Sequence, residues 1–192
     1  MENITPYKLV IDIETSNSFA DVGGHKNLAQ LNTSFVGVYS YNKNEYLSFY
    51  EDGLEKLGPL LQKAGLVIGF ALNRFDIPVL DKHFSFNLFA LPRLDILEEI
   101  ELSSGIRISL NILAKANLGI GKTGHGLEAI TLYKEGRLQE LRDYCLMDVR
   151  LTKELYDLVK RQGYLIIPDK ITDEPQKIAL SFKDAEMPSK LF

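Results

Sequence analysis

Cysteine is nearly absent from this sequence, since Cys145 is the single example in 192 residues. One thiol cannot form an internal disulfide, which excludes a small scaffold stapled by disulfide bonds. A lone thiol is also typical of proteins kept in a reducing compartment, and we therefore expect a cytoplasmic location.

Long hydrophobic runs are lacking as well. Asp12 and Glu14 interrupt the first apolar stretch, so the N-terminal residues do not have the apolar region of a signal peptide. No stretch approaches the roughly 20 apolar residues needed to span a bilayer. We expect no membrane partner.

The sequence also has no excess of positive charge. Lys and Arg number 22 against 26 Asp and Glu, which gives a formal net charge of −4. This balance excludes a broad basic field that would hold nucleic acid by its phosphates alone. Any contact with nucleic acid must therefore be local.

What is present is an ordinary globular composition, with 45% hydrophobic and 25% charged residues. The length predicts one domain, which we place at residues 1–165, followed by a C-terminal tail at 166–192. Apolar and β-branched runs predict strands, and apolar residues at helical spacing predict helices. The predicted strands are 7–13, 34–41, 45–50 and 66–70, and the predicted helices are 54–64, 75–84, 109–118 and 137–161. This order favours a single α/β domain with a mixed β-sheet flanked by α-helices.

Two carboxylates end the first predicted strand, in the segment VIDIET. Because side chains alternate along a strand, Asp12 and Glu14 project from the same face, roughly 7 Å apart along the backbone. An isolated pair of this kind usually marks a strand end that reaches solvent. Here it follows a continuous apolar strand, which favours a functional role.

A third carboxylate, Asp76, stands where the segment GFALNRFDIPVL passes from a predicted strand into a predicted helix. Aspartate is a favoured N-cap residue, so a purely structural role as a helix cap is one interpretation. A role as a metal ligand is the other.

A fourth carboxylate, Asp148, interrupts the apolar stripe of the long C-terminal helix. That stripe consists of Leu138, Leu141, Cys145, Asp148, Thr152, Leu155 and Val159. A buried carboxylate needs a proton, a basic partner or a cation. Tyr144 lies one turn before Asp148 on the same face. A mixed α/β sheet can bring the four acids together, and their mutual repulsion then predicts bound cations, with Mg²⁺ or Mn²⁺ favoured by oxygen ligands.

Together these motifs resemble the DEDD superfamily of 3′-5′ exonucleases, which have the ribonuclease H-like fold. VIDIET resembles the first motif of the superfamily, GFALNRFDIPVL the second, and YCLMD the third, in the Y-x-x-x-D form of the tyrosine subtype (DEDDy). The segment SLNILAKANLGIGK is similar to the region between the second and third motifs in the exonuclease domains of family B DNA polymerases. The resemblance covers about residues 7–160.

The resemblance implies a hydrolase that removes 5′-mononucleotides from a free 3′ end of DNA or RNA, with a single strand as the expected substrate. It implies that two divalent cations, Mg²⁺ or Mn²⁺, are bound and drive the reaction. The implied metal ligands are Asp12, Glu14, Asp76 and Asp148. Tyr144 completes the implied catalytic set by orienting the attacking water, because an unperturbed tyrosine pKa near 10 makes it a poor base.

Substrate contacts are expected from Thr15, Asn73 and Lys122. The sequence departs from the family pattern at Ala71, where the family usually has an asparagine, and Asn73 lies two positions later. That asparagine is not a metal ligand in the family, so we expect activity to survive the change. The C-terminal tail is the candidate surface for a protein partner.

Two other functions are suggested by parts of the sequence. The segment ANLGIGKTG, residues 116–124, resembles a P-loop, but Ala116 replaces the first glycine and a helix is predicted where a strand should precede the loop. The second alternative is a non-catalytic nucleic-acid-binding or scaffolding module that keeps the fold. The retained acids argue against it, because mutually repelling carboxylates have no structural benefit.

Overall fold

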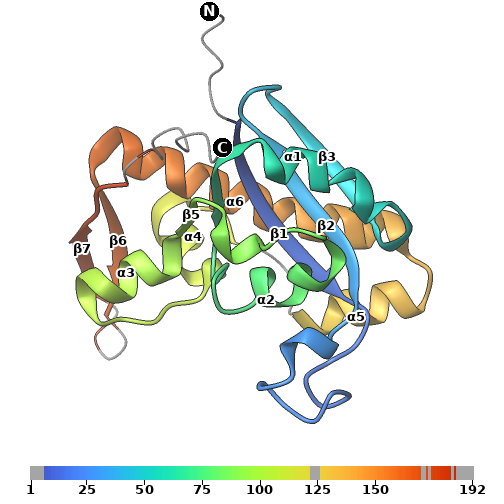
Figure 1. Cartoon of the computed structure of the whole chain (residues 1–192). Helices are drawn as coiled ribbons and strands as arrows, with labels where there is room; N and C mark the ends of the chain where they lie inside the picture. Colours follow the sequence, from blue (N-terminus) through green and yellow to red (C-terminus); the bar gives the residue numbers. More distant parts are fainter. Residues whose placement is uncertain (1–6, 122–125, 170–171, 173, 183, 185–192) are drawn as a thin grey trace, which may run out of the picture.

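The computed structural model describes residues 7–121, 126–169, 172, 174–182 and 184 (Figure 1). Its strands are β1 (Tyr7–Thr15), β2 (Thr33–Ser40), β3 (Glu45–Tyr50), β4 (Ala64–Gly69), β5 (Arg93–Asp95), β6 (Tyr164–Pro168) and β7 (Pro175–Ala179). Its α-helices are α1 (Gly58–Gln62), α2 (Asp76–Leu80), α3 (Ile96–Ser104), α4 (Leu110–Leu118), α5 (Gly126–Lys134) and α6 (Leu138–Gln162). Short 3₁₀ helices are η1 (Leu28–Gln30), η2 (Glu51–Lys56), η3 (Asp81–His83) and η4 (Leu88–Ala90).

The main sheet has five strands in the order β3-β2-β1-β4-β5. β1 pairs with β2 in antiparallel and with β4 in parallel orientation, so the sheet is mixed, as predicted. β1 lies at the centre, paired with β4 over Tyr7–Val10 and with β2 over Leu9–Thr15. The C-terminal ends of β1, β4 and β5 therefore lie at the same end of the sheet.

Each face of the sheet is covered by helices, as Figure 1 shows: α6 crosses one face, and α1 and α2 cover the other. Alternation along β1 divides its side chains between the two layers. Val10 is buried in the cluster that contains Val149 and Leu155 of α6, whereas Ile11 is buried in the cluster that contains Leu61 and Ile77.

The long helix α6 agrees closely with the predicted 137–161 and ends at Gly163, whose positive φ of 77° suits a C-terminal glycine cap. Every residue of the predicted stripe is buried except Leu138, which is 40% exposed, and Val149, Leu151 and Tyr156 are buried in addition. Helix α4 also agrees with its prediction. Ser109 caps it by accepting a hydrogen bond from the backbone N–H of Ile112. A helix therefore precedes residues 119–121, which contradicts the context that a P-loop needs.

The segment expected to be a tail begins inside the hairpin of β6 and β7. Leu165, Ile167, Leu180 and Phe182 are buried in the same cluster as α6. Asn117 of α4 fastens this hairpin, because its side chain both donates to and accepts from the backbone of Ile166, at 2.7 Å in each case. Packed structure thus continues past residue 165.

None of the helices in the described ranges combines the length and the apolar character needed to cross a bilayer.

Candidate active site

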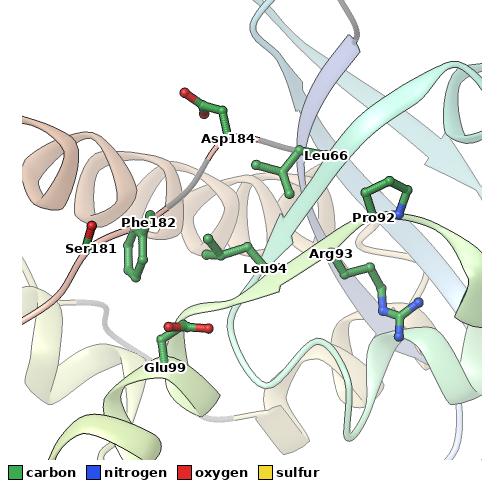
Figure 2. Close-up of a pocket in the computed structure, with 8 residues that line it drawn as sticks. All are labelled: Leu66, Pro92, Arg93, Leu94, Glu99, Ser181, Phe182 and Asp184. Carbon is green, nitrogen blue, oxygen red and sulfur yellow. The ribbon is translucent and has the colours of Figure 1, made fainter. Parts of the chain in front are cut away.

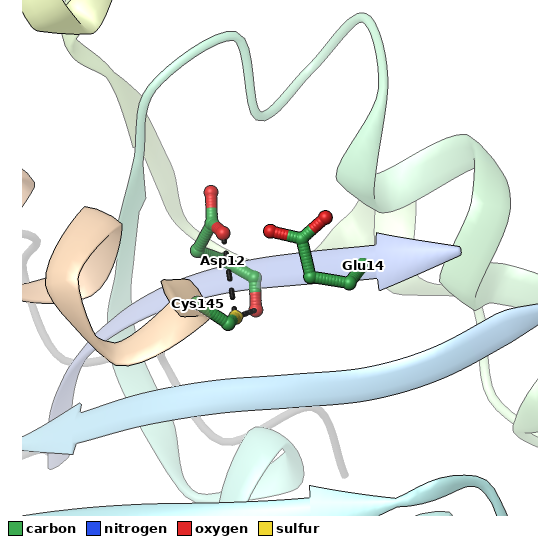
Figure 3. A group of neighbouring side chains, drawn as sticks. All are labelled: Asp12, Glu14 and Cys145. Carbon is green, nitrogen blue, oxygen red and sulfur yellow. Dashed lines mark hydrogen bonds between the residues drawn. The ribbon is translucent and has the colours of Figure 1, made fainter. Parts of the chain in front are cut away.

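The centre of the site is the pair of carboxylates at the end of β1. Asp12 lies opposite Gly37 of β2, and Glu14 lies opposite Phe35. Both carboxylates project from the face of β1 that α6 covers, as the alternation of the strand predicts (Figure 3). Glu14 is only 8% exposed. Ligand atoms of Asp12, Glu14 and Cys145 all lie within 4.8 Å of one another, a grouping that could hold a metal ion.

Cys145 joins this group from α6, and sequence reasoning did not place it in the site. Its Sγ lies 3.4 Å from both Oδ2 and the backbone oxygen of Asp12. Burial, and then the charges of Asp12 and Glu14, raise the pKa of the thiol well above its usual value. The group is therefore an S–H donor to Asp12. Its position directly after Tyr144 in the third motif was the available signal.

Helix α6 comes this close to β1 because residue 37 is a glycine. A Cβ atom at Gly37 would lie 2.9 Å from Cγ2 of Val149 and 3.1 Å from Sγ of Cys145. Any side chain would therefore push the helix away from the sheet beside Asp12. Gly37 sets the distance between the two elements that carry the site.

Asp148 lies three residues after Cys145, on the same face of α6, and is 7% exposed. The two arginines nearest in sequence have partners elsewhere. Arg142 contacts Asp143 and Ser48, and Arg150 pairs with Glu154 at 2.8 Å.

Tyr144, one turn before Asp148, is partly buried against the cluster of Phe35, Leu132 and Cys145. It also lines a cavity of about 250 Å³ between α5 and α6, with Met147 and the acidic side chains of Glu128, Glu140 and Asp143. The tyrosine therefore faces an open space between α5 and α6.

Asp76 is the first residue of α2, not its N-cap, which is Phe75. The interpretation of Asp76 as a helix cap is thus not supported. The side chain is 3% exposed. Burial, followed by the charge of Asp12, raises the pKa of its carboxyl group well above the usual value. Asp76 is therefore close enough to Asp12 for the two charges to interact.

The loop before α2 is anchored by Asp95, a residue that sequence reasoning missed. Asp95 ends β5 and is 3% exposed. Its carboxylate accepts backbone hydrogen bonds from Ala71 and Asn73 as well as from the first turn of α3. The segment LDILEE, an aspartate followed by a helical pattern, was a detectable N-cap signal. Ala71 itself has a positive φ of 62°, uncommon for alanine.

The expected substrate contacts have different surroundings. The hydroxyl of Thr15 donates to the backbone oxygen of Asn17 at 2.9 Å. The side chain of Asn73 donates to Glu98 at 2.5 Å and accepts from Arg93 at 2.9 Å, so it holds the loop to α3 and β5. Lys122 lies outside the described residues.

A further cavity, of about 410 Å³, is separate from the acidic group (Figure 2). It is lined by Leu66, Pro92, Arg93, Leu94, Glu99, Ser181, Phe182 and Asp184. None of Asp12, Glu14, Asp76 and Asp148 contributes to its wall.

The donor set around Asp12 fits a divalent cation. Carboxylates gathered in a partly buried site repel one another, and burial together with the charge of Asp12 raises the pKa of Asp76. Oxygen donors of this kind suit Mg²⁺ and Mn²⁺.

Comparison with known proteins identifies a family and similar solved structures. The model of the RNase_H superfamily matches residues 9–160. Among solved structures, the chain is similar to the family B DNA polymerase from the hyperthermophilic archaeon Pyrobaculum calidifontis, with a TM-score of 0.61 and 15% sequence identity. The similarity covers 81% of this chain and 25% of the polymerase, so the chain corresponds to about a quarter of that protein. A search of curated proteins found no match.

Proposed function

This chain belongs to the RNase_H superfamily, and from that premise we propose that it is a metal-dependent 3′-5′ exonuclease of the DEDDy type. Its substrate would be a single strand of DNA or RNA with a free 3′ end, and its products 5′-mononucleotides. The superfamily supports a nuclease-type hydrolase that acts on nucleic acid. The 3′-to-5′ direction of hydrolysis and the metal-dependent mechanism are what we propose beyond that.

The observation that carries the proposal is the meeting of acidic residues from separate elements. Asp12 and Glu14 come from β1, and Cys145 of α6 contacts Asp12. Asp76 enters from α2, close enough for the charge of Asp12 to raise its pKa. Asp148 lies on the face of α6 that Cys145 shares. Such a group is costly to bury unless it binds cations.

Asp12, Glu14, Asp76 and Asp148 would hold two Mg²⁺ or Mn²⁺ ions. Bound there, such ions supply a water of lowered pKa and offset negative charge on the phosphate. Tyr144 would orient the attacking water through its hydroxyl group, since it is carried one turn from Asp148 and borders an open cavity. The S–H···O contact of Cys145 would hold the Asp12 carboxylate in one orientation.

The remaining residues complete the proposal. Thr15 would contact the terminal nucleotide through its backbone, because its hydroxyl is bonded to Asn17. Asn73 and Lys122 remain proposed substrate-binding residues. Asn73 would act by positioning the loop, because its side chain bonds to Glu98 and Arg93. We also propose a cytoplasmic location and a protein partner that binds the C-terminal segment 166–192, which includes strand β7.

The decisive experiment is digestion of matched DNA and RNA oligonucleotides, single-stranded and duplex, each labelled so that release from the 3′ end is visible. We expect 5′-mononucleotides in Mn²⁺ or Mg²⁺ and none in EDTA. Asp148→Ala should lower the rate by at least about two orders of magnitude, since the site acts mainly through electrostatics.

Glu154→Ala is the matched control, because Glu154 is also a carboxylate on α6 but pairs with Arg150. It should leave the rate unchanged. Binding of the oligonucleotides without any metal-dependent release would favour the non-catalytic module. Rates that are equal for wild type and Asp148→Ala would refute the proposal.

A further inference from the structure

We propose that Asp95 is a positioning residue for the metal ligand Asp76, acting through the backbone of the 69–75 loop. This inference rests on the proposed function, in which Asp76 binds a divalent cation. Asp95 is not assigned to the metal itself.

The carboxylate of Asp95 joins two segments of backbone. Its Oδ1 accepts hydrogen bonds from the N–H of Ala71 at 2.9 Å and of Leu97 at 3.1 Å. Its Oδ2 accepts one from the N–H of Asn73 at 3.0 Å. One buried side chain thus links the loop before Asp76 to the first turn of α3.

Backbone hydrogen bonds within the loop connect the residues held by Asp95 to the residues on either side of Asp76. The backbone oxygen of Ala71 accepts from the N–H of Phe75 at 3.0 Å, and the oxygen of Leu72 accepts from the N–H of Ile77 at 3.1 Å. These bonds fix the residues on either side of Asp76. The groups that Asp95 holds therefore belong to the same turn that sets the direction of the Asp76 side chain.

The anchor is needed because the turn contains a strained residue. Ala71 has a φ of 62°, a left-handed conformation that costs an alanine about 1–2 kcal/mol. Strained residues persist where surrounding contacts over-determine them. The hydrogen bond from Ala71 to Asp95 is such a contact, and the bonds of Asn73 to Arg93 and Glu98 support the same loop.

A carboxylate suits this role because it only accepts hydrogen bonds, and the groups around it only donate. An asparagine would turn an NH₂ group toward one of these N–H donors. A serine would keep one oxygen close to the backbone, which is enough to cap α3. It could not replace the two oxygens that reach the loop. Asp95→Ser should thus keep the cap of α3 while removing the hydrogen bonds to the loop.

The test measures Mn²⁺ binding to the whole chain by electron paramagnetic resonance, without any nucleic acid and well below the unfolding temperature of each variant. We expect Asp95→Ser and Asp95→Asn to weaken Mn²⁺ binding at least about fivefold. Adding Ala71→Gly to Asp95→Ser should restore part of the affinity, because glycine relieves the strain that Asp95 supports. Because the measurement is made on folded protein, a loss of stability alone would leave the Mn²⁺ affinity unchanged.

The matched control is Asp81→Asn, at the other end of α2. Asp81 also accepts a backbone hydrogen bond, from Leu88 at 2.8 Å, but does not bond to the 69–75 loop. It should leave Mn²⁺ affinity unchanged. Wild-type affinity in Asp95→Ser, with a folded protein, would overturn this inference and leave the exonuclease proposal intact. Failure of the wild type to bind Mn²⁺ would instead refute the proposed function and with it this role.

Discussion

At the scale of single residues, Ala71 occupies a conformation that alanine adopts reluctantly. Its φ is 62°, and asparagine and glycine are the residues that tolerate this region. An asparagine at this position, as in the pattern that the sequence resembles, would tolerate the same conformation. We predict that Ala71→Gly and Ala71→Asn each raise the free energy of unfolding by about 1 kcal/mol, measured by urea denaturation.

Ala116→Gly is the control for that prediction. Ala116 is an exposed residue in α4, where glycine should lower the free energy of unfolding by about 0.5–1 kcal/mol. The same substitution should thus raise the free energy of unfolding at residue 71 and lower it at residue 116. A loss of stability at both would contradict the assignment of strain to residue 71.

Asp76 predicts a dependence of stability on pH in the metal-free protein. Its folded pKa is raised above the ordinary 3.8 by burial and by Asp12, so the folded state binds the proton more tightly than the unfolded state. Stability from this group is present below that ordinary value and is lost as the pH rises toward the folded pKa. In EDTA, Asp76→Asn should therefore be more stable than wild type at pH 8, with little difference near pH 4.

Saturating Mn²⁺ should reverse the order at pH 8, because only the wild type gains the full stabilisation from binding. Thermal unfolding of both proteins, with and without the metal, measures the effect. Equal thermal unfolding midpoints for the two proteins at every pH in EDTA would contradict the raised pKa of Asp76.

At the scale of elements, Gly37 controls how closely α6 approaches β1 and β2. We predict that Gly37→Ala lowers the free energy of unfolding by about 1–3 kcal/mol, since a methyl group overpacks this contact. The outward shift of α6 should also weaken Mn²⁺ binding. Gly53→Ala is the control, because no atom lies within 4 Å of a Cβ at that position. Equal effects of the two variants would contradict this role.

The elements themselves were largely predictable from sequence. The central strand, α4 and α6 follow from their periodicity, and the four acids follow from motifs placed on those elements. Helix α5 and strand β7 were missed, because neither has a strong periodic signal and both depend on tertiary packing. The close packing at Gly37 and the hydrogen bonds of Asp95 to the loop could not be predicted, because each depends on a distance between segments far apart in sequence.

At the scale of the whole molecule, the net charge of −4 predicts weak dependence of substrate binding on salt. A site that captures only a chain end would contact about two or three phosphates. With about 0.7 ions released per phosphate of a single strand, KM should rise no more than about twentyfold between 50 and 200 mM salt.

Digestion of a single-stranded 3-mer and a 20-mer at each salt concentration measures this, at a fixed Mn²⁺ concentration. Both lengths should give similar KM values. A steep salt dependence that appears only with the longer strand would indicate an extended binding groove and contradict capture by the end alone.

The central position of β1 has one last consequence, for amide hydrogen exchange. β1 pairs with β4 over Tyr7–Val10 and with β2 over Leu9–Thr15 and packs against α6, so the N–H groups around Leu9 and Val10 should exchange with solvent only when the whole protein opens. Asp12 and Glu14 follow this doubly paired stretch and remain paired with β2. The strand that carries these two acids should thus outlast any partial opening of the outer loops.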